Sequence, residues 1–323
     1  MGSLRSWSVA LIGIIAAGLG SAQAATISAG WTAADYNNPF IQNDGPRCAA
    51  TSTVNSFLYL QSKYPNTYGT KLVPAGTAGA VRTALAADMG IPANNRPNEN
   101  NDGDPLPNMW WNAKVNYMNS VAPGKTAFAG QFAANYFNVA LQTDIYSVAF
   151  GNGYVQDTQP TFSFLLKELQ DGEDVEVAFQ AFDATNGPNG TWVDHAVTLT
   201  GLSFNDNNNN GVWDAKGPNA EGATITYLDP NIQNGVAPGT SLTTGLTLNT
   251  QSFGPGNDFD FLTFNWNNGS NRAVNGAFLY LAFAITRATA DFIHGGIGAA
   301  GSRVGIQAAR RQCSPPRMTA ESI

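Results

Sequence analysis

The chain has 323 residues, of which 43 % are hydrophobic and only 12 % are charged. Its polar surface must therefore come largely from Asn, Thr, Ser, Gln and Gly, a balance that suits an exported protein with many turns and strands. The formal net charge of −7 argues against nucleic acid as a partner, because phosphates need a basic surface.

The N-terminus has the organisation of a signal peptide. Arg5 supplies a positive charge, residues 9–19 form a short apolar core, and Ala22-Gln23-Ala24 offers the small residues that signal peptidase recognises. The apolar run is shorter than the ~20 residues that cross a bilayer. We therefore expect cleavage after Ala24, a secreted mature chain and no membrane span within it. An uncleaved N-terminal anchor is the alternative.

Apolar periodicity predicts helices in the first half of the chain. They cover residues 48–63, 78–89, 108–121 and 161–169. Residues 92–107, between the second and third helices, are rich in Asn, Asp and Pro, which predicts a loop.

The second half changes to alternating or short apolar runs, which predict strands. They cover residues 175–179, 193–204, 223–228 and 277–286, the last of which also fits a helix. Helices followed by strands indicate an α+β domain with an antiparallel sheet. We divide the chain into a signal peptide (1–24), one domain (25–290) and a poorly ordered Gly/Ala/Arg-rich tail (291–323).

The chain has only two cysteines, Cys48 and Cys313, and two histidines, His195 and His294, so few nucleophile–base pairs are available. Cys48 opens a predicted helix, where unpaired backbone N–H groups favour a thiolate. His195 opens an apolar strand that would orient its ring, whereas His294 and Cys313 lie in the tail. We therefore pair Cys48 with His195 as nucleophile and general base. A Cys48–Cys313 disulfide is the alternative for an exported chain.

Several segments around these residues, in order, resemble the papain-like cysteine peptidases, above all their bacteriocin-processing branch, which removes double-glycine leaders. Gln42 lies six positions before Cys48, the spacing at which that family places an oxyanion-binding glutamine. The matching segments are Gln42 to Ser52, Leu169 to Val177, His195 to Gly201 and Tyr227 to Asn231. The cysteine motif of the plant and lysosomal relatives is absent.

The resemblance implies a papain-like fold, in which a helical half packs against an antiparallel β-sheet half. It implies that Cys48 attacks the scissile carbonyl, that His195 transfers the proton and that Asp229 orients the imidazole. Gln42 and the Cys48 backbone N–H would bind the oxyanion. We accordingly expect a secreted thiol protease, a hydrolase that acts on a peptide or protein and requires no cofactor. The alternatives are a non-catalytic surface- or matrix-binding module of the same fold, and an amide or acyl transferase with the same site.

A possible calcium loop lies between the strands of His195 and Asp229. Its oxygen-bearing side chains at alternate positions, with a glycine sixth, match D-x-N-x-N-G. The residues concerned are Asp206, Asn208, Asn210 and Asp214. The acid expected at the twelfth position is missing, since Gly217 stands there. An Asn-rich hairpin tip without a metal is the favoured interpretation, with Ca²⁺ as the alternative.

Overall fold

A computed structural model describes most of the predicted domain. The described residues are 25–43, 47–91, 107–133, 154–183, 191–231, 239–252, 256, 258–267 and 273–287. All of them belong to one compact unit, Met1–Ala288. The predicted signal peptide, the predicted tail and most of the predicted loop at 92–107 lie outside the described residues.

The predicted helices all form, with bounds within two residues of the expected ones. The described helices are η1 (Ala33–Asn37), α1 (Cys48–Lys63), α2 (Pro65–Tyr68), α3 (Ala78–Asp88), α4 (Pro107–Val121) and α6 (Phe162–Gln170). η1 and α2 are too short to show a helical period in the sequence. α6 begins at a cap, because the Thr161 hydroxyl accepts the backbone N–H of Phe164 at 3.3 Å.

The strands form one sheet. They are β1 (Ala25–Gly30), β2 (Thr126–Phe132), β3 (Tyr154–Asp157), β4 (Asp174–Asp183), β5 (Thr191–Asp206), β6 (Ala223–Leu228), β7 (Ser241–Ser252), β8 (Asp258–Asn267) and β9 (Ala273–Arg287). β4 pairs with both β5 and β9, so the six strands from β4 to β9 close on themselves with antiparallel pairing throughout. The expected α+β class with an antiparallel sheet is therefore confirmed, and residues 277–286 are strand, not helix.

The remaining strands extend this closed sheet. β1 pairs with β5 beyond the end of β4, and β2 joins β9 to β3. The sequence analysis did not predict β1, β2, β3, β7 or β8. β7 shows why: most of its side chains are only partly buried or exposed, so its sequence has no clear apolar alternation.

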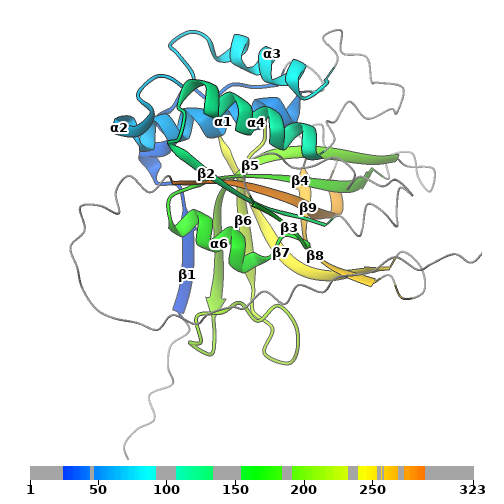
Figure 1. Ribbon diagram of the computed structural model, residues 1–323. Coiled ribbons are helices and arrows are strands. Elements are labelled where there is room, and N and C mark those ends of the chain that lie inside the picture. Colours follow the sequence, from blue (N-terminus) through cyan, green and yellow to red (C-terminus); the bar gives the residue numbers. More distant parts are fainter. Residues whose placement is uncertain are drawn as a thin grey trace, which may run out of the picture. The chain divides into compact units, whose positions relative to one another are not determined.

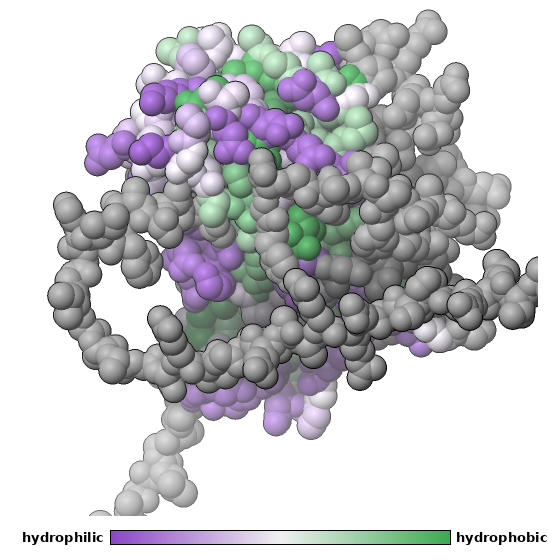
Figure 2. Space-filling model, viewed as in Figure 1, coloured by the Kyte–Doolittle hydropathy of each residue, from purple (hydrophilic) through white to green (hydrophobic). Residues whose placement is uncertain are grey.

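The helices divide between two sides of the sheet, as Figure 1 shows: α1, α3 and α4 gather on one side, and α6 lies on the other, near β1. Hydrophilic residues form a band over the helical layer at the top of Figure 2. α1 is buried from Cys48 to Leu60, because it packs against the strands and against its neighbouring helices. No helix among the described residues is long and apolar enough to cross a membrane.

A buried ionic cluster joins α4 to β4. The Lys114 ammonium lies 3.0 Å from an Asp174 carboxylate oxygen and also bonds to Glu176. All three side chains are at most 1 % exposed. Burial raises the pKa of Glu176 to about 7: Lys114 opposes the shift, and neighbouring Asp174 adds to it. One ammonium thus serves two carboxylates inside the protein.

Candidate active site

The structure brings His195 and Asp229 into direct contact. His195 lies on β5, and Asp229 directly follows β6, the antiparallel neighbour of β5. The ring Nε2 of His195 lies 2.8 Å from Asp229 Oδ1, and both side chains are almost completely buried. Adjacent strands thus place next to each other two residues that are 34 positions apart in the chain.

Trp266 of β8 completes this arrangement, and the sequence analysis missed it. Its indole N–H donates to Asp229 Oδ2 at 2.8 Å, and its ring stacks on His195 with centroids 4.8 Å apart. Phe179 of β4 meets the same imidazole edge-on. The sequence around Trp266 does not indicate that its side chain contacts His195 and Asp229. That contact depends on where β8 lies in the closed sheet relative to β5 and β6.

The hydrogen bonds around Asp229 keep it ionised. Burial opposes its charge, but His195, the Trp266 N–H and the Asn231 backbone N–H together outweigh burial and hold the pKa of Asp229 below its ordinary value. Asn231 donates at 2.8 Å to the same oxygen that contacts His195. Asp229 is therefore suited to orient a histidine and stabilise its cationic form.

Cys48 lies at the first position of α1, as expected, with 6 % of its surface exposed. The backbone N–H groups of a first helical turn have no partner within the helix, and they favour negative charge. The thiol therefore occupies the position in a helix where a thiolate is most stabilised.

Ser52, one turn after Cys48, ties α1 to the strand of His195. Its hydroxyl donates to the carbonyl oxygen of Ala196 at 3.0 Å, and Thr198 donates back to the Ser52 carbonyl at 3.0 Å. Alternation along β5 turns Ala196 toward α1 and His195 toward Phe179. These two bonds fix α1 at Ser52 against β5 at the residues that follow His195.

The segment of Gln42 is also anchored beside Asp229. The Gln42 carbonyl accepts from the Arg82 guanidinium at 2.7 Å. The next residue, Asn43, donates its backbone N–H to the Pro230 carbonyl at 2.6 Å. Residues 44–46, which connect this segment to α1, lie outside the described residues. The Gln42 segment therefore lies beside the residue that follows Asp229.

The remaining cysteine and histidine, Cys313 and His294, lie outside the described residues. The alternative disulfide between Cys48 and Cys313 therefore also falls outside the described residues.

The possible calcium loop forms the turn between β5 and β6. Both carboxylate oxygens of Asp206 accept backbone N–H groups of the turn, from Asn210 at 3.0 Å and from Gly211 at 2.8 Å. The Asn208 and Asn210 amides donate to Asp214 at 2.5 Å and 3.2 Å. These contacts satisfy the oxygens within the turn itself.

Glu221 lies beyond the twelfth position and folds back into this turn. Its carboxylate accepts the backbone N–H of Asn207 at 2.6 Å and that of Asp214 at 3.0 Å, and it is buried. Within the described part of the chain, no three His, Cys, Asp or Glu side chains are grouped as metal ligands. The turn is held together by its own hydrogen bonds.

No protein-family model and no curated protein sequence matches this chain.

Proposed function

We propose that this protein is a secreted cysteine peptidase, with Cys48 as nucleophile, His195 as general base and Asp229 as the residue that orients the base. The observation that supports this most strongly is the buried contact of 2.8 Å between His195 Nε2 and Asp229 Oδ1. A neutral imidazole that donates from Nε2 to a carboxylate has Nδ1 as its basic nitrogen. That is the tautomer a thiol needs in order to lose its proton.

The reaction follows from these roles. Nδ1 of His195 takes the proton of the Cys48 thiol, and the sulfur attacks the substrate carbonyl carbon. The peptide C–N bond breaks as His195 gives that proton to the departing amine, which leaves a thioester on Cys48. Water then loses a proton to His195, attacks the thioester and releases the carboxylic acid and the restored thiol.

Gln42 and the Cys48 backbone N–H are the proposed donors to the oxyanion. The hydrogen bond of Asn43 to Pro230 supports this role, because it holds the Gln42 segment near the end of β6. A donor of this kind contributes about 10²–10³ in rate. The six-residue spacing to Cys48 and the resemblance to papain-like peptidases point to the same assignment.

Export is the second part of the proposal. Ala25, the first residue after the predicted cleavage site, pairs with Asp206 of β5. Cleavage after Ala24 would leave a new N-terminus next to an intact strand. N-terminal sequencing of the secreted protein is expected to begin at Ala25, and an intact Met1 on a membrane-bound product would contradict cleavage.

Labelling with a thiol-directed peptidyl electrophile tests the catalytic assignment. We expect rapid modification of Cys48 in the wild type, and a rate reduced about 10²-fold or more in His195→Ala, because the thiolate loses its base. His294→Ala and Cys313→Ser are the matched controls, since they remove the other histidine and the other cysteine. Both controls should label at the wild-type rate.

Two results would contradict the proposal. A wild-type Cys48 that labels no faster than it does in His195→Ala would favour the non-catalytic binding module. Transfer of the acyl group to an added amine in preference to water would identify a transferase instead of a peptidase.

Calcium is a separate proposal for the turn between β5 and β6. The carboxylates of Asp206 and Glu221 are buried there. Calcium binding would raise the melting temperature of the wild type, and Glu221→Gln would reduce that increase. A melting temperature and activity unchanged by a chelator would identify the turn as a metal-free hairpin tip.

A further inference from the structure

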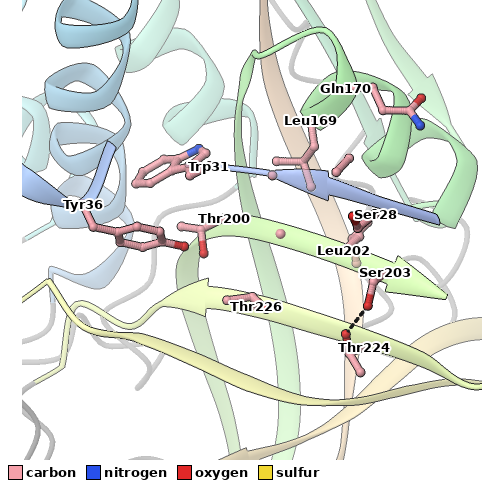
Figure 3. Close-up of a pocket in the computed structure, with 13 residues that line it drawn as sticks. Ser28, Trp31, Tyr36, Leu169, Gln170, Thr200, Leu202, Ser203, Thr224 and Thr226 are labelled. Atoms are coloured by element: carbon pink, nitrogen blue, oxygen red, sulfur yellow. Dashed lines mark hydrogen bonds between the residues drawn. The ribbon is translucent and has the colours of Figure 1, made fainter. Parts of the chain in front are cut away.

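A groove with a volume of about 540 Å³ opens over β1, β5 and β6, beside the end of α6. Figure 3 shows Leu169 and Gln170 of α6 reaching over β1 at one side, and Trp31 and Tyr36 closing the other. Ser and Thr side chains rise from the strands between them. The described residues that line the groove are all uncharged. Its size lies within the range of about 300–1,000 Å³ typical of small-molecule sites.

The floor of the groove is hollow because two glycines face each other across β1 and β5. Gly30 pairs with Gly201, and Gly201 pairs with Thr226 of β6. Gly30 has a φ of +153°, and a Cβ there would overlap the backbone carbonyl of Thr200, so only glycine fits. At Gly201 a Cβ would lie 3.4 Å from the Thr226 Cβ, an ordinary contact. A side chain at position 201 is therefore tolerated and would occupy the hollow.

Two polar atoms of the groove residues have no hydrogen-bond partner within the described part of the chain: Trp31 Nε1 and Thr200 Oγ1. Trp31 is 9 % exposed and Thr200 is 1 % exposed. The Trp31 ring is held in place by stacking on Tyr59, with centroids 4.1 Å apart and planes at 6°. An unpaired buried donor or acceptor is costly, and native proteins rarely keep one without a reason. A bound molecule at this wall would supply the partner.

We propose that the groove binds a neutral, hydroxyl-rich ligand, a short segment of carbohydrate. Its Ser and Thr hydroxyls can each donate and accept, which suits sugar hydroxyls, and the half-buried Tyr36 adds an aromatic ring at one end. Charged ligands find no counter-charge among the lining residues. An extended peptide has no free backbone edge on β5 or β6 here, because both strands are already paired on each side; among the described strands of the groove, only β1 keeps an unpaired edge.

The groove is separate from the candidate active site. Thr200 follows His195 by five residues on β5, a distance of roughly 17 Å along an extended strand. Carbohydrate binding therefore does not depend on the proposed peptidase activity. It would hold the protein on a glycan-bearing surface or a glycosylated substrate.

Gly201→Ala and Gly201→Val test the proposal, because they fill the hollow at a position where an added Cβ meets only ordinary contacts. Gly245→Val is the matched control: it lies on β7 outside the groove, and a Cβ there has nothing within 4 Å. Trp31→Phe and Thr226→Val remove a polar group from the groove wall without adding bulk. Isothermal titration with maltotriose, cellotriose and chitotriose measures binding, and circular dichroism confirms folding.

We expect at least one of these sugars to bind the wild type and the Gly245→Val control equally. Gly201→Val should weaken that binding about tenfold or more, and Trp31→Phe and Thr226→Val should weaken it by a smaller factor. Three results would overturn the proposal: no binding of any of the three sugars up to about 10 mM; sugar binding unaffected by the Gly201 and Thr226 variants; or a groove occupied by an extended peptide instead. Cys48 labelling should remain at the wild-type rate in every variant, which separates this test from that of the peptidase.

Discussion

Two buried carboxylates in this protein have pKa values shifted in opposite directions. Asp229 beside His195 has a lowered pKa, whereas the pKa of Glu176 beside Lys114 is raised to about 7. Both are buried and both face a basic group, so burial alone does not decide the outcome. The number of hydrogen-bond donors to each carboxylate decides the direction of its pKa shift. Asp229 accepts from an indole N–H and a backbone N–H in addition to the imidazole.

Glu176 lacks this support. It shares the Lys114 ammonium with Asp174, and Ser56 is the one further hydrogen-bonding group that lowers its pKa. The Asp229 network therefore holds a fixed charge in a defined direction, as the proposed mechanism requires. The Lys114 cluster instead links a helix to a strand, and its own charge depends on pH.

Replacing Asp229 by Asn should have the largest effect. The amide can no longer stabilise a cationic His195, so we expect the rate of peptide hydrolysis to fall roughly 10³–10⁴-fold. Hydrolysis of a mixed peptide library, followed by mass spectrometry, measures the loss. Asp260→Asn is the control, since Asp260 is an exposed aspartate with a lowered pKa at a surface lysine. Equal activity in the two variants would remove Asp229 from the mechanism.

Replacing Lys114 by Met should destabilise the fold. Two buried carboxylates would lose the ammonium that they share, and breaking a buried ion pair costs about 3–5 kcal/mol. Urea unfolding measures the change in the free energy of unfolding. Lys167→Met breaks the exposed pair with Asp171 and should change stability by at most about 1 kcal/mol. Similar values for both variants would show that the buried cluster is not structurally important.

Trp266→Phe should have an intermediate effect. Phenylalanine keeps a ring against His195 but removes the N–H that donates to the Asp229 carboxylate, a bond to a charged group worth about 1.5–3 kcal/mol. The pKa of Asp229 should rise, which would move the acidic limb of the activity profile to higher pH.

Trp213→Phe is the matched control for Trp266→Phe. The Trp213 N–H donates to a neutral acceptor, the Glu221 carbonyl oxygen, at 3.0 Å. Its loss should cost about 0.5–1.5 kcal/mol and leave the activity profile in place. A shifted profile in this control would show that Trp266 has no specific effect on Asp229.

The pH dependence of stability should have opposite signs for the two clusters. Glu176 binds its proton more tightly when folded, so its contribution to stability is present below about pH 4.5 and is lost as pH rises through about 7. Asp229 contributes above its unfolded pKa, and that contribution is lost as pH falls through its lowered folded pKa.

Chemical unfolding between pH 5 and pH 8 measures the contribution of Glu176 to stability. We expect the free energy of unfolding to decrease by about 2–3 kcal/mol over this range, since the pKa of Glu176 is raised from 4.5 to about 7 and one pKa unit corresponds to about 1.4 kcal/mol. Glu176→Gln should flatten the decrease, and Asp229→Asn should leave it unchanged. A slope that persists in Glu176→Gln would assign it to another group.

Sequence patterns were sufficient for the elements that have a clear apolar period. The helix that begins at Cys48 and the strand that contains His195 both form as predicted, because each buries a continuous apolar run. His195 and Asp229, which the order of the sequence segments paired, lie in contact. β7 escaped prediction because its partly exposed Thr and Asn residues are stabilised by pairing with β6 and β8.

The sequence by itself determined the α+β class, the position of Cys48 at a helix start and the candidate partners His195 and Asp229. The tertiary structure alone decided that Trp266 contacts both His195 and Asp229, that Lys114 serves two buried carboxylates, and that Gly30 and Gly201 open a groove. The physical reason is the same in each case. Local periodicity specifies which face of an element is apolar, whereas contacts between distant strands depend on how the sheet closes.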